Sequence, residues 1–245
     1  MHEHSKVAIV TGASRGIGAT VAERLAQDGF AVAVNYASGA AQAEALVARL
    51  RAQGLSALAV QADVARPDDV RRLFDAAEAG LGKVSVLVNN AGIMQVSPVA
   101  DTTDALFDRH FAVNVKGTFN TMREAARRLA DGGRIINFST TALALKLPGY
   151  ATYNATKAAV EAYTATFAKE LRGRAITVNA VAPGPVETEL FLNGKTEQQV
   201  AQMAAMAPLE RLGQPEDIAR VVAFLAGPDG GWINGQVLRA NGGLA

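Results

Sequence analysis

The chain has 245 residues, of which 49% are hydrophobic and 19% charged, and it contains no cysteine. Its 24 Lys and Arg against 23 Asp and Glu leave a formal charge of +1, so no overall basic field favours nucleic acid or an anionic membrane as a partner. The lack of cysteine excludes disulfides, thiolate nucleophiles and cysteine-bound zinc, and the length suits one large domain with a substantial core.

Short runs rich in Val, Ile and Ala recur along the chain, and most of them are apolar at nearly every position. Strands that helices cover on both faces show this pattern, so the runs predict a parallel sheet. The seven candidate strands cover Val7 to Val10, Ala31 to Tyr36, Ala57 to Gln61, Val84 to Asn89, Arg134 to Phe138, Ile176 to Val181 and Gln236 to Arg239.

Longer segments between these runs repeat apolar residues at the spacing of a helix face. Such helices are predicted over Gly18 to Asp28, Ala40 to Gln53, Asp68 to Gly80 and Tyr153 to Arg172. Pro67 and Pro215 mark two helix starts, because each is followed by carboxylates that suit the first turn of a helix. Since no linker or repeat divides the alternation, we expect one α/β domain over residues 1–245, with a doubly wound parallel sheet of Rossmann type.

Directly after the first predicted strand, three glycines stand in the pattern G-x-x-x-G-x-G and lead into a helix. Glycines there allow a tight turn and a close approach of the backbone to a pyrophosphate at the helix N-terminus. The strand before and the helix after supply the context that this motif requires, so the loop predicts dinucleotide binding rather than a plain turn. The expected contacts come from Gly12, Ser14, Arg15, Gly16, Ile17 and Gly18.

The end of the second predicted strand indicates which dinucleotide is bound. An NAD site commonly places a carboxylate there for the adenosine ribose, but this chain has Asn35, Tyr36 and Ser38. No carboxylate repels a 2′-phosphate, and the cation of Arg15 and the hydroxyl of Ser38 favour NADP(H) over NAD(H). If Arg15 is only a solvated loop cation, the preference is weak.

The third predicted strand is followed by Asp63 and Val64, which we also assign to the cofactor site. The Asp63 carboxylate either accepts a hydrogen bond from the adenine amino group or caps the following helix.

Tyr153 and Lys157 lie four residues apart, hence about one turn apart on one helix face. A free tyrosine, with a pKa of about 10, is a weak acid-base catalyst near neutrality, whereas a neighbouring cation favours the phenolate and lowers the pKa. The pair therefore predicts an acid-base tyrosine activated by lysine. Taken alone, the same spacing also describes a common solvated pair on a helix surface.

The segment from Pro183 to Gln214 departs from the strand and helix alternation, since it carries three prolines, three glycines and two methionines. Long connections in compact domains are usually functional or mobile, so residues 184–212 are predicted to form a substrate lid. A purely structural or oligomer-contact role is the alternative.

Together these motifs resemble the short-chain dehydrogenase/reductase family over essentially the whole chain, in order and in spacing. The resemblance rests on Thr11 to Gly18, Asn89 to Gly92, Asn114, Ser139 with Thr140, Tyr153 with Lys157, and Pro183 with Gly184. The stretches from Gly213 to Ala219 and from Asn234 to Gly243 are similar to the 3-oxoacyl-carrier-protein reductase branch.

The resemblance implies catalytic roles. Tyr153 would protonate a carbonyl oxygen or deprotonate an alcohol, and Lys157 would lower its pKa and bind the nicotinamide ribose. Asn114 would hold a water of a proton relay, or else bond backbone in a helix kink. The family's orienting serine, thirteen residues before the tyrosine, is here Thr140, with Ser139 as the alternative.

The resemblance also implies further cofactor contacts. Asn90, Ala91 and Gly92 would lie under the adenine, and Pro183, Gly184, Val186 and Thr188 would hold the carboxamide and pyrophosphate. Apolar and polar residues would line the substrate pocket, namely Met94, Gln95, Leu143, Leu145, Tyr150, Val186, Leu190 and Phe191.

The implied function is an NADP(H)-dependent oxidoreductase that transfers a hydride between nicotinamide and a carbonyl or alcohol. A 3-oxoacyl thioester is one candidate substrate, and Arg127, Arg128, Arg172 and Arg174 would then attract an acidic carrier protein unless they form a solvated helix face. The alternatives are a reductase of small aldehydes, ketones or sugars and, from another class, a non-catalytic NADP-binding sensor.

Likeness to the family further implies a homotetramer. Val160, Thr164, Phe167 and Leu171 form a stripe that either contacts another subunit or belongs to the core, and the C-terminal segment from Gly242 to Ala245 would lie near a subunit contact.

Two absences complete the expectations. No apolar run reaches the ~18 residues of a spanning helix and no leader precedes Lys6, so a soluble, cytoplasmic protein without membrane partner is expected. His2, His4 and His110 have no ligand spacing, so no metal site is predicted.

Overall fold

The computed structural model describes residues 6–245, which contain a seven-stranded parallel sheet of order β3-β2-β1-β4-β5-β6-β7. Every neighbouring pair is parallel, as the apolar runs predict. The strands are β1 (Val7–Val10), β2 (Ala31–Tyr36), β3 (Ala57–Gln61), β4 (Val84–Asn89), β5 (Arg134–Phe138), β6 (Thr177–Pro183) and β7 (Val237–Ala240). The predicted bounds of the first five are confirmed, and those of β6 and β7 differ by one or two residues at each end.

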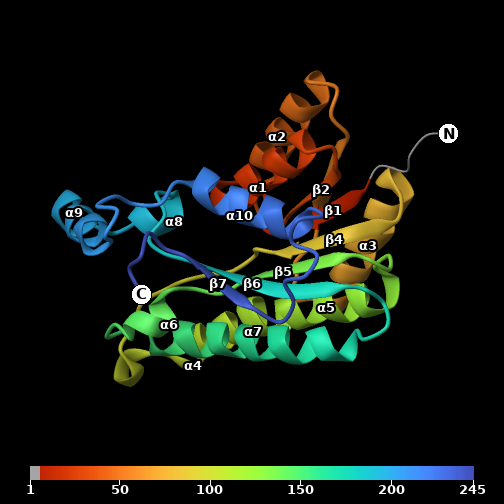
Figure 1. Ribbon diagram of the computed structural model, residues 1–245. Coiled ribbons are helices and arrows are strands. Elements are labelled where there is room, and N and C mark those ends of the chain that lie inside the picture. The colour runs from red at the N-terminus through yellow and green to blue at the C-terminus, as the bar shows by residue number, and fades with distance from the viewer. Residues whose placement is uncertain (1–5) are drawn as a thin grey trace.

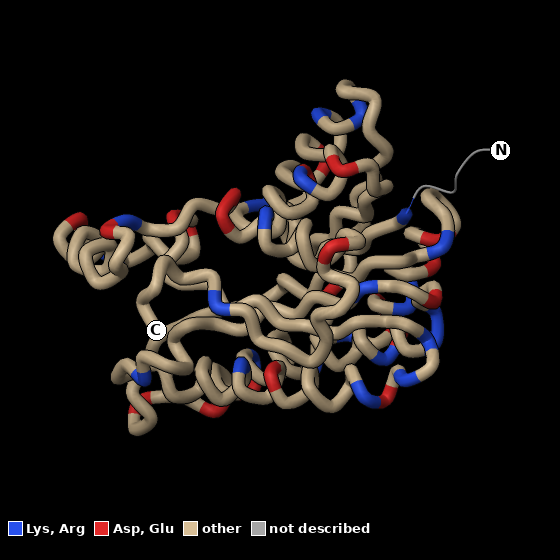
Figure 2. The backbone as a smooth tube through the Cα atoms, viewed as in Figure 1, with Lys and Arg blue, Asp and Glu red and all other residues tan. Residues whose placement is uncertain are grey.

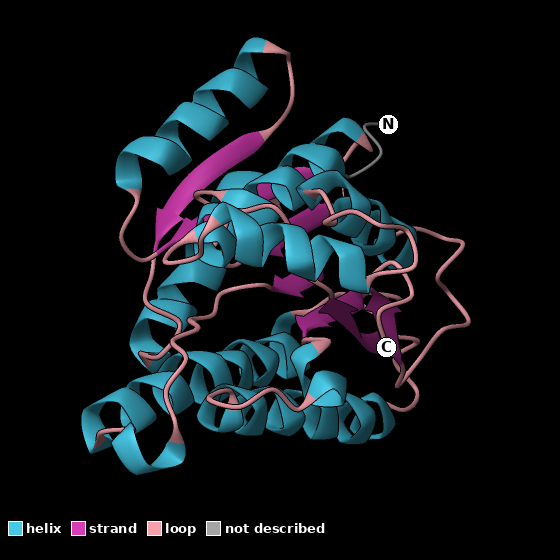
Figure 3. Cartoon of the chain, turned by 90° about the vertical axis from the view of Figure 1, so that its left-hand side faces the viewer, coloured by secondary structure: helices cyan, strands magenta, loops and turns pink. Residues whose placement is uncertain are grey.

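Two layers of helices cover the sheet, so the predicted Rossmann-type fold is confirmed (Figures 1 and 3). One face is covered by α1 (Gly16–Gln27), α2 (Ala40–Ala52) and α10 (Pro215–Ala226), and the other by α3 (Pro67–Leu81), α5 (Gly117–Arg128) and α7 (Ala151–Glu170). The N-terminal end of the described chain lies at one edge of this sandwich, and the segments that follow the strands gather at the other (Figure 1).

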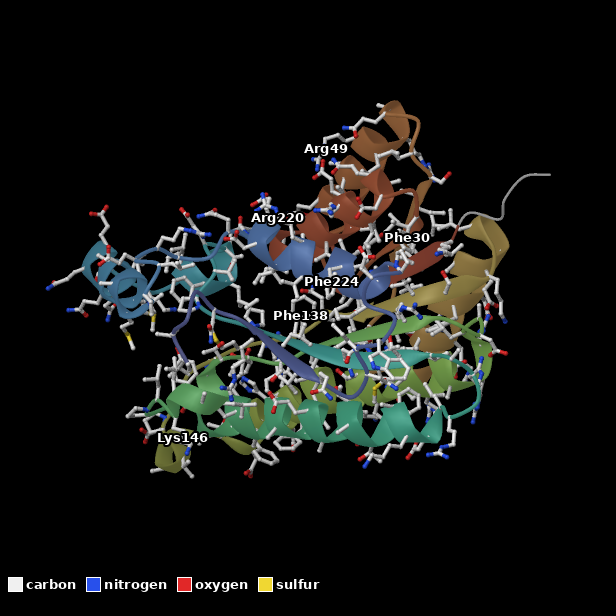
Figure 4. The ribbon with its side chains drawn as sticks, in the orientation of Figure 1. Phe30, Arg49, Phe138, Lys146, Arg220 and Phe224 are labelled. Carbon is white, nitrogen blue, oxygen red and sulfur yellow. The ribbon has the colours of Figure 1, made fainter. Side chains whose placement is uncertain are left out.

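Both faces of each central strand are buried, which explains why the runs do not alternate. In β1, Ala8 and Val10 belong to the core with α1 and α10, whereas Val7 and Ile9 belong to the core with α3 and α5. Figure 4 places Phe138, at the end of β5, between the sheet and α10. Burial of this kind contributes roughly 25 cal/mol per Å² of apolar surface and is the main stabilising term of the fold.

The sequence patterns miss several helices. Among them is α5, whose inward face is polar, because Thr118, Asn120, Thr121 and Glu124 are all buried. A helix of that kind has no apolar stripe to detect. The shorter ones are η1 (Val99–Asp101), α4 (Asp104–His110), the π-helix η2 (Phe111–Lys116) and α6 (Ala142–Leu145).

The segment predicted as a lid contains two helices, α8 (Glu189–Leu192) and α9 (Glu197–Met206), at the edge where the strands end (Figure 1). Thr188 and Thr196 cap them, and Thr196 forms a reciprocal capping box with Gln199. The prolines and glycines of this segment made its sequence read as a loop, although it contains these two helices.

The stripe of α7 belongs to the core. Val160, Thr164, Phe167 and Leu171 are all at most 9% exposed, so the prediction that they contact another subunit is wrong. They face the sheet because β5 and β6 lie against this side of the helix. Over residues 6–245, no helix is both long and apolar enough to span a bilayer.

Candidate functional site

Two cavities open side by side at the carboxyl ends of the strands, where ligands bind in open α/β sheets. The first, of about 620 Å³, lies at the ends of β1, β2 and β3 and is called here the adenosine pocket. The second, of about 160 Å³, lies between the ends of β5 and β6, α7 and the lid segment, and is called the reaction cavity. Asn90 lines both, so the two cavities form one crevice.

The glycine loop between β1 and α1 has the geometry that its sequence predicts. Gly12 and Gly16 take left-handed backbone conformations, with φ of 62° and 55°. A Cβ on Gly12 would lie 2.8 Å from the Cα of Ala91, and one on Gly18 would lie 2.5 Å from the carbonyl oxygen of Gly12. Glycine is therefore required for close packing as well as for backbone conformation.

Asn90 fastens this loop to the end of β4. Its amide nitrogen donates to the carbonyl oxygens of Thr11 at 2.9 Å and Gly12 at 3.0 Å. The Thr11 hydroxyl in turn accepts from the Ala91 N–H at 3.1 Å. These bonds hold the first turn of α1 beside the crevice.

The end of β2 lines the adenosine pocket with Asn35, Tyr36 and Ser38. Asn35 is buried, and its amide links the Gly12 N–H to the Ala62 carbonyl oxygen, so this side chain connects strands. Ser38 is exposed, and Arg15 extends into solvent with 71% of its side chain exposed, 3.5 Å from Glu189. The pocket thus offers a cation and hydroxyl groups at the end of β2.

Asp63 and Val64, after β3, also line the adenosine pocket. One Asp63 oxygen accepts from the Ala65 N–H at 2.9 Å and closes a turn, while the N-terminal residue of α3 is preceded by Arg66. Asp63 is therefore not the cap of α3. Sequence reasoning missed other lining residues from α2, α4 and η2, because those elements carry no motif: Gln42, Arg109, Ala112 and Val113.

Tyr153 and Lys157 project from the first turns of α7 into the reaction cavity. Burial raises the pKa of Tyr153 to about 12; a hydrogen bond with Thr140 acts in the opposite direction. Burial lowers the pKa of Lys157 to about 8, and its ammonium donates to the Phe138 carbonyl oxygen at 2.8 Å.

The expected lowering of the Tyr153 pKa by Lys157 is not found in this structure. The Lys157 nitrogen lies 5.8 Å from the centroid of the Tyr153 ring, and burial is the largest influence on the pKa of the Tyr153 phenol. Tyr153 is consequently a protonated hydroxyl group over the whole range near neutrality, as a proton donor requires.

The two hydroxyl residues after β5 have different surroundings. Ser139 donates to a carboxylate oxygen of Glu161 at 2.5 Å, toward α7, whereas Thr140 is the residue bonded to Tyr153. Thr140 also accepts from the Ala142 N–H at 3.2 Å, which fixes its side chain at the start of α6.

Asn114 lies in the π-helix η2 and is buried. Its amide oxygen accepts from the Ile93 N–H at 2.8 Å, and its amide nitrogen donates to the Ile93 carbonyl oxygen and to Thr156. The predicted bonding of backbone at a helix irregularity is thus present. π-Helices of one turn are frequent at functional sites.

The segment after β6 forms one wall of the reaction cavity through Pro183, Gly184, Val186 and Thr188. Of the eight residues predicted to line the substrate pocket, six do so: Met94, Leu145, Tyr150, Val186, Leu190 and Phe191. Gln95 and Leu143 do not, and Leu147 and Met203 join the lining instead.

The arginines proposed to attract a carrier protein lie at the opposite end of the molecule. Arg127 and Arg128 end α5, and Arg172 and Arg174 follow α7, so all four precede the strands rather than follow them. Arg128 pairs with Glu78 at 2.7 Å, and Arg174 pairs with Asp131 at 2.8 Å. Figure 2 shows charged residues gathered at this end. Placement of these four residues at the pocket mouth is therefore wrong.

His2 and His4 lie outside the described residues. His110 is fully buried and hydrogen-bonded at both ring nitrogens. Among residues 6–245, no group of His, Cys, Asp and Glu has an arrangement that could hold a metal ion.

Comparison with known proteins adds independent findings. A family described as "Enoyl-(Acyl carrier protein) reductase" matches residues 12–245. A "short-chain type dehydrogenase/reductase" of Picea abies is 46% identical, over 97% of this chain and 92% of that protein. An "NADPH-dependent aldehyde reductase-like protein, chloroplastic" of Arabidopsis thaliana is 44% identical, over 97% and 93%. A blue fluorescent protein from a metagenomic library, solved with NADPH, is 40% identical, covers both chains fully and has a TM-score of 0.93.

Proposed function

The chain belongs to the short-chain dehydrogenase/reductase family and is an oxidoreductase of carbonyl and alcohol groups that uses NADP(H). On this basis, we propose that it reduces free, apolar aldehydes or ketones with Tyr153 as the proton donor. The observation that carries this proposal is the convergence of Tyr153, Thr140 and Lys157 in a cavity that continues into the glycine-lined adenosine pocket.

The residues of the crevice fit NADP(H). Gly12 and Gly18 let the glycine loop pack tightly against the end of β4, and Gly16 has no atom nearer than 3.6 Å to the place of a Cβ, so the backbone at the start of α1 is open to a pyrophosphate. The 2′-phosphate would meet the guanidinium of Arg15 and the hydroxyl of Ser38, and no carboxylate stands at the end of β2 to repel it. We assign the remaining predicted contacts around the crevice to the same cofactor.

When bound, the nicotinamide supplies the hydride in reduction or accepts it in oxidation. Tyr153 donates its phenolic proton to the carbonyl oxygen as the hydride arrives at carbon. Thr140 donates a hydrogen bond to that oxygen and orients the carbonyl. Ser139 already donates its hydroxyl hydrogen to Glu161. Lys157 stabilises the phenolate left behind, and Asn114 holds the segment that separates the two cavities.

The substrate class follows from the lining of the reaction cavity. Apart from the catalytic hydroxyls, it consists mainly of aliphatic, methionine and aromatic side chains. Such a cavity suits a carbonyl compound with an apolar body, as an aldehyde reductase-like relative suggests. A 3-oxoacyl thioester fits the chemistry too, but the arginines at the far end give no support for a carrier protein.

Three further proposals concern the whole chain. Residues 184–212 act as a lid, because α8 and α9 place Leu190, Phe191 and Met203 over the cavity. The protein is cytoplasmic and forms a homotetramer. Exposed apolar side chains such as Trp232, which is 98% exposed, support contacts between subunits, and light scattering after size exclusion would test them.

The experiment that tests the function measures NADPH oxidation with benzaldehyde, diacetyl, a polycyclic quinone, an aldose and an acetoacetyl thioester. NADH is tested in parallel, and Tyr153→Phe is the blank. Turnover that requires Tyr153 with a free carbonyl compound is expected. Activity only on the thioester would replace the proposed substrate class, and tight NADPH binding without any turnover would favour a sensor.

A further inference from the structure

A short segment outside helices and strands, residues 91–97, runs between the adenosine pocket and the reaction cavity. Every second residue donates its backbone N–H to a different part of the fold. The acceptors are the Thr11 hydroxyl for Ala91 at 3.1 Å, the Asn114 amide oxygen for Ile93 at 2.8 Å, the His110 ring nitrogen Nε2 for Gln95 at 3.2 Å and the Gly149 carbonyl oxygen for Ser97 at 2.9 Å.

The third of these acceptors, His110, has no part in the chemistry described above. Its ring is fully buried, at the end of α4. Because the Gln95 N–H can only donate, Nε2 must accept, and the ring proton is on Nδ1, which donates to the Leu106 carbonyl oxygen at 2.9 Å. His110 and Asn114 are four residues apart, so they bind the segment at two successive points from one side of the same helical stretch.

Met94 lies between the two points that Asn114 and His110 hold. Its neighbours Gly92 and Ile93 line the adenosine pocket, whereas Met94 itself lines the reaction cavity. Asn114 binds both the N–H and the carbonyl of Ile93, which fixes the cofactor side of the segment. The bond from Gln95 to His110 fixes the side toward the substrate.

We propose that His110 is a positioning residue for carbonyl reduction: by holding Gln95, it sets where the Met94 side chain stands against the substrate. This inference rests on the proposed function. Gln95 is itself exposed, so without the ring nitrogen its N–H would turn to water, and nothing would hold this point of the segment against the buried His110 ring. Met94 would move with it, and the substrate would lose its packing contact with the Met94 side chain. Tyr153 and the glycine loop would stay in place.

Three substitutions separate the hydrogen bond from ring packing. His110→Gln keeps an acceptor near the place of Nε2, His110→Asn keeps a polar group only near Nδ1, and His110→Phe keeps a ring without an acceptor. With the polycyclic quinone as substrate, KM should rise about 10-fold in the Phe and Asn variants, the effect of losing one hydrogen bond that positions Met94, and stay within about 2-fold in the Gln variant. The NADPH Kd and kcat should change by less than about 3-fold, because the Asn114 contacts remain.

A spectroscopic measurement follows Met94 directly. In protein labelled with ¹³C at the methionine methyl groups, the Met94 resonance can be assigned with Met94→Leu, and the core residue Met122, which is 3% exposed, is the internal control. His110→Phe and His110→Asn should shift the Met94 resonance and leave Met122 in place, whereas His110→Gln should leave both unchanged. An unshifted Met94 resonance in folded His110→Phe and His110→Asn would overturn the proposal.

A double-mutant cycle tests whether the effect passes through Met94. In a Met94→Ala background, His110→Asn should change KM by less than about 2-fold, because the wall that it positions has been removed. Full additivity of the two substitutions would overturn the proposal. No carbonyl turnover by the parent enzyme would overturn the proposed function and this role with it, whereas an active parent with an unchanged KM in the Phe and Asn variants would overturn only the role of His110.

Discussion

The adenosine pocket and the reaction cavity share a crevice but are built from different parts of the chain. The adenosine pocket is formed by the glycine loop and by residues at the ends of β2, β3 and β4, which the side-chain amides of Asn35 and Asn90 tie together. The reaction cavity is formed by side chains from β5, α6, α7, the segment after β4 and the lid. The comparison teaches that the adenosine pocket takes its shape from motifs that are local in the chain, such as the left-handed backbone of Gly12 and Gly16, whereas the reaction cavity depends on side chains that tertiary structure brings together.

The largest expected effect is at Tyr153, which lies in the reaction cavity close to where it joins the adenosine pocket. Tyr153→Phe removes the proton donor but keeps the ring, so kcat should fall by about 10²–10⁴-fold while the NADPH Kd stays unchanged. Stopped-flow turnover and cofactor fluorescence titration measure the two quantities. A Phe variant with parental kcat would show that another group supplies the proton.

The next largest effect is expected from a methyl group added to the glycine loop, which borders the adenosine pocket. In Gly18→Ala the new Cβ would lie 2.5 Å from the Gly12 carbonyl oxygen and would also collide with the Asn90 side-chain amide. Backbone atoms cannot give way, so we expect a loss of about 1–3 kcal/mol in the free energy of unfolding, typical of overpacking. The NADPH affinity should fall more than about tenfold, because the loop that binds the pyrophosphate is displaced.

Gly80→Ala in α3 is the matched control for that change. Its Cβ would meet only the flexible end of Leu58, at 2.7 Å, so unfolding and cofactor binding should stay close to the parent. Thermal unfolding and NADPH titration of both variants compare them. Equal effects at the two positions would mean that the glycine loop is no more tightly built than an ordinary helix.

The same contrast determines how far the sequence could predict this molecule. The glycine loop, the first five strands and the positions of Tyr153 and Lys157 follow from local patterns, and the structure confirms the strands and brings Tyr153 and Lys157 to the crevice. Short-range patterns suffice there because strand, turn and helix are consecutive in the chain.

Other features could not be predicted because they depend on burial and on tertiary neighbours. The polar inward face of α5 hides its helix, and the pKa of Tyr153 is set by desolvation rather than by the nearby cation. The four arginines at the end of α5 and after α7 are candidates for a docking patch in the sequence, but the fold places them at the end of the sheet opposite the reaction cavity. The role that we infer for His110 likewise rests on a contact across 15 residues that no motif signals.

The pH dependence of reduction should sharpen the comparison at Lys157. Its pKa is lowered to about 8, so above that pH the ammonium that stabilises the phenolate is lost, while Tyr153, with a pKa of about 12, stays protonated. The kcat/KM for reduction should therefore be level below about 8 and fall as the pH rises above it. Lys157→Arg keeps its charge and should remove this alkaline limb. If kcat/KM still falls at alkaline pH in that variant, the titrating group is not Lys157.

The burial of Lys157 has a second consequence, for stability. Between about 8 and 10 the unfolded chain binds more protons at this residue than the folded chain, because the unperturbed pKa is 10.5. The free energy of unfolding should therefore rise with pH across this window in the parent but not in Lys157→Met. Urea unfolding at several pH values measures the difference.

The smallest expected effect is in the lid, where side chains rather than backbone make the contact. Phe191 lines the reaction cavity and its neighbour Leu192 does not, although both belong to α8. Phe191→Ala should raise KM for an apolar ketone by about 3–10-fold, since part of an aromatic contact is lost at a partly solvated surface, and Leu192→Ala should leave KM unchanged. Neither should alter the NADPH Kd by more than about 2-fold, because the glycine loop is untouched. If both alanine variants weaken NADPH binding instead, the lid belongs to the cofactor pocket, and the division of the crevice into an adenosine pocket built from local motifs and a reaction cavity built from tertiary contacts fails at α8.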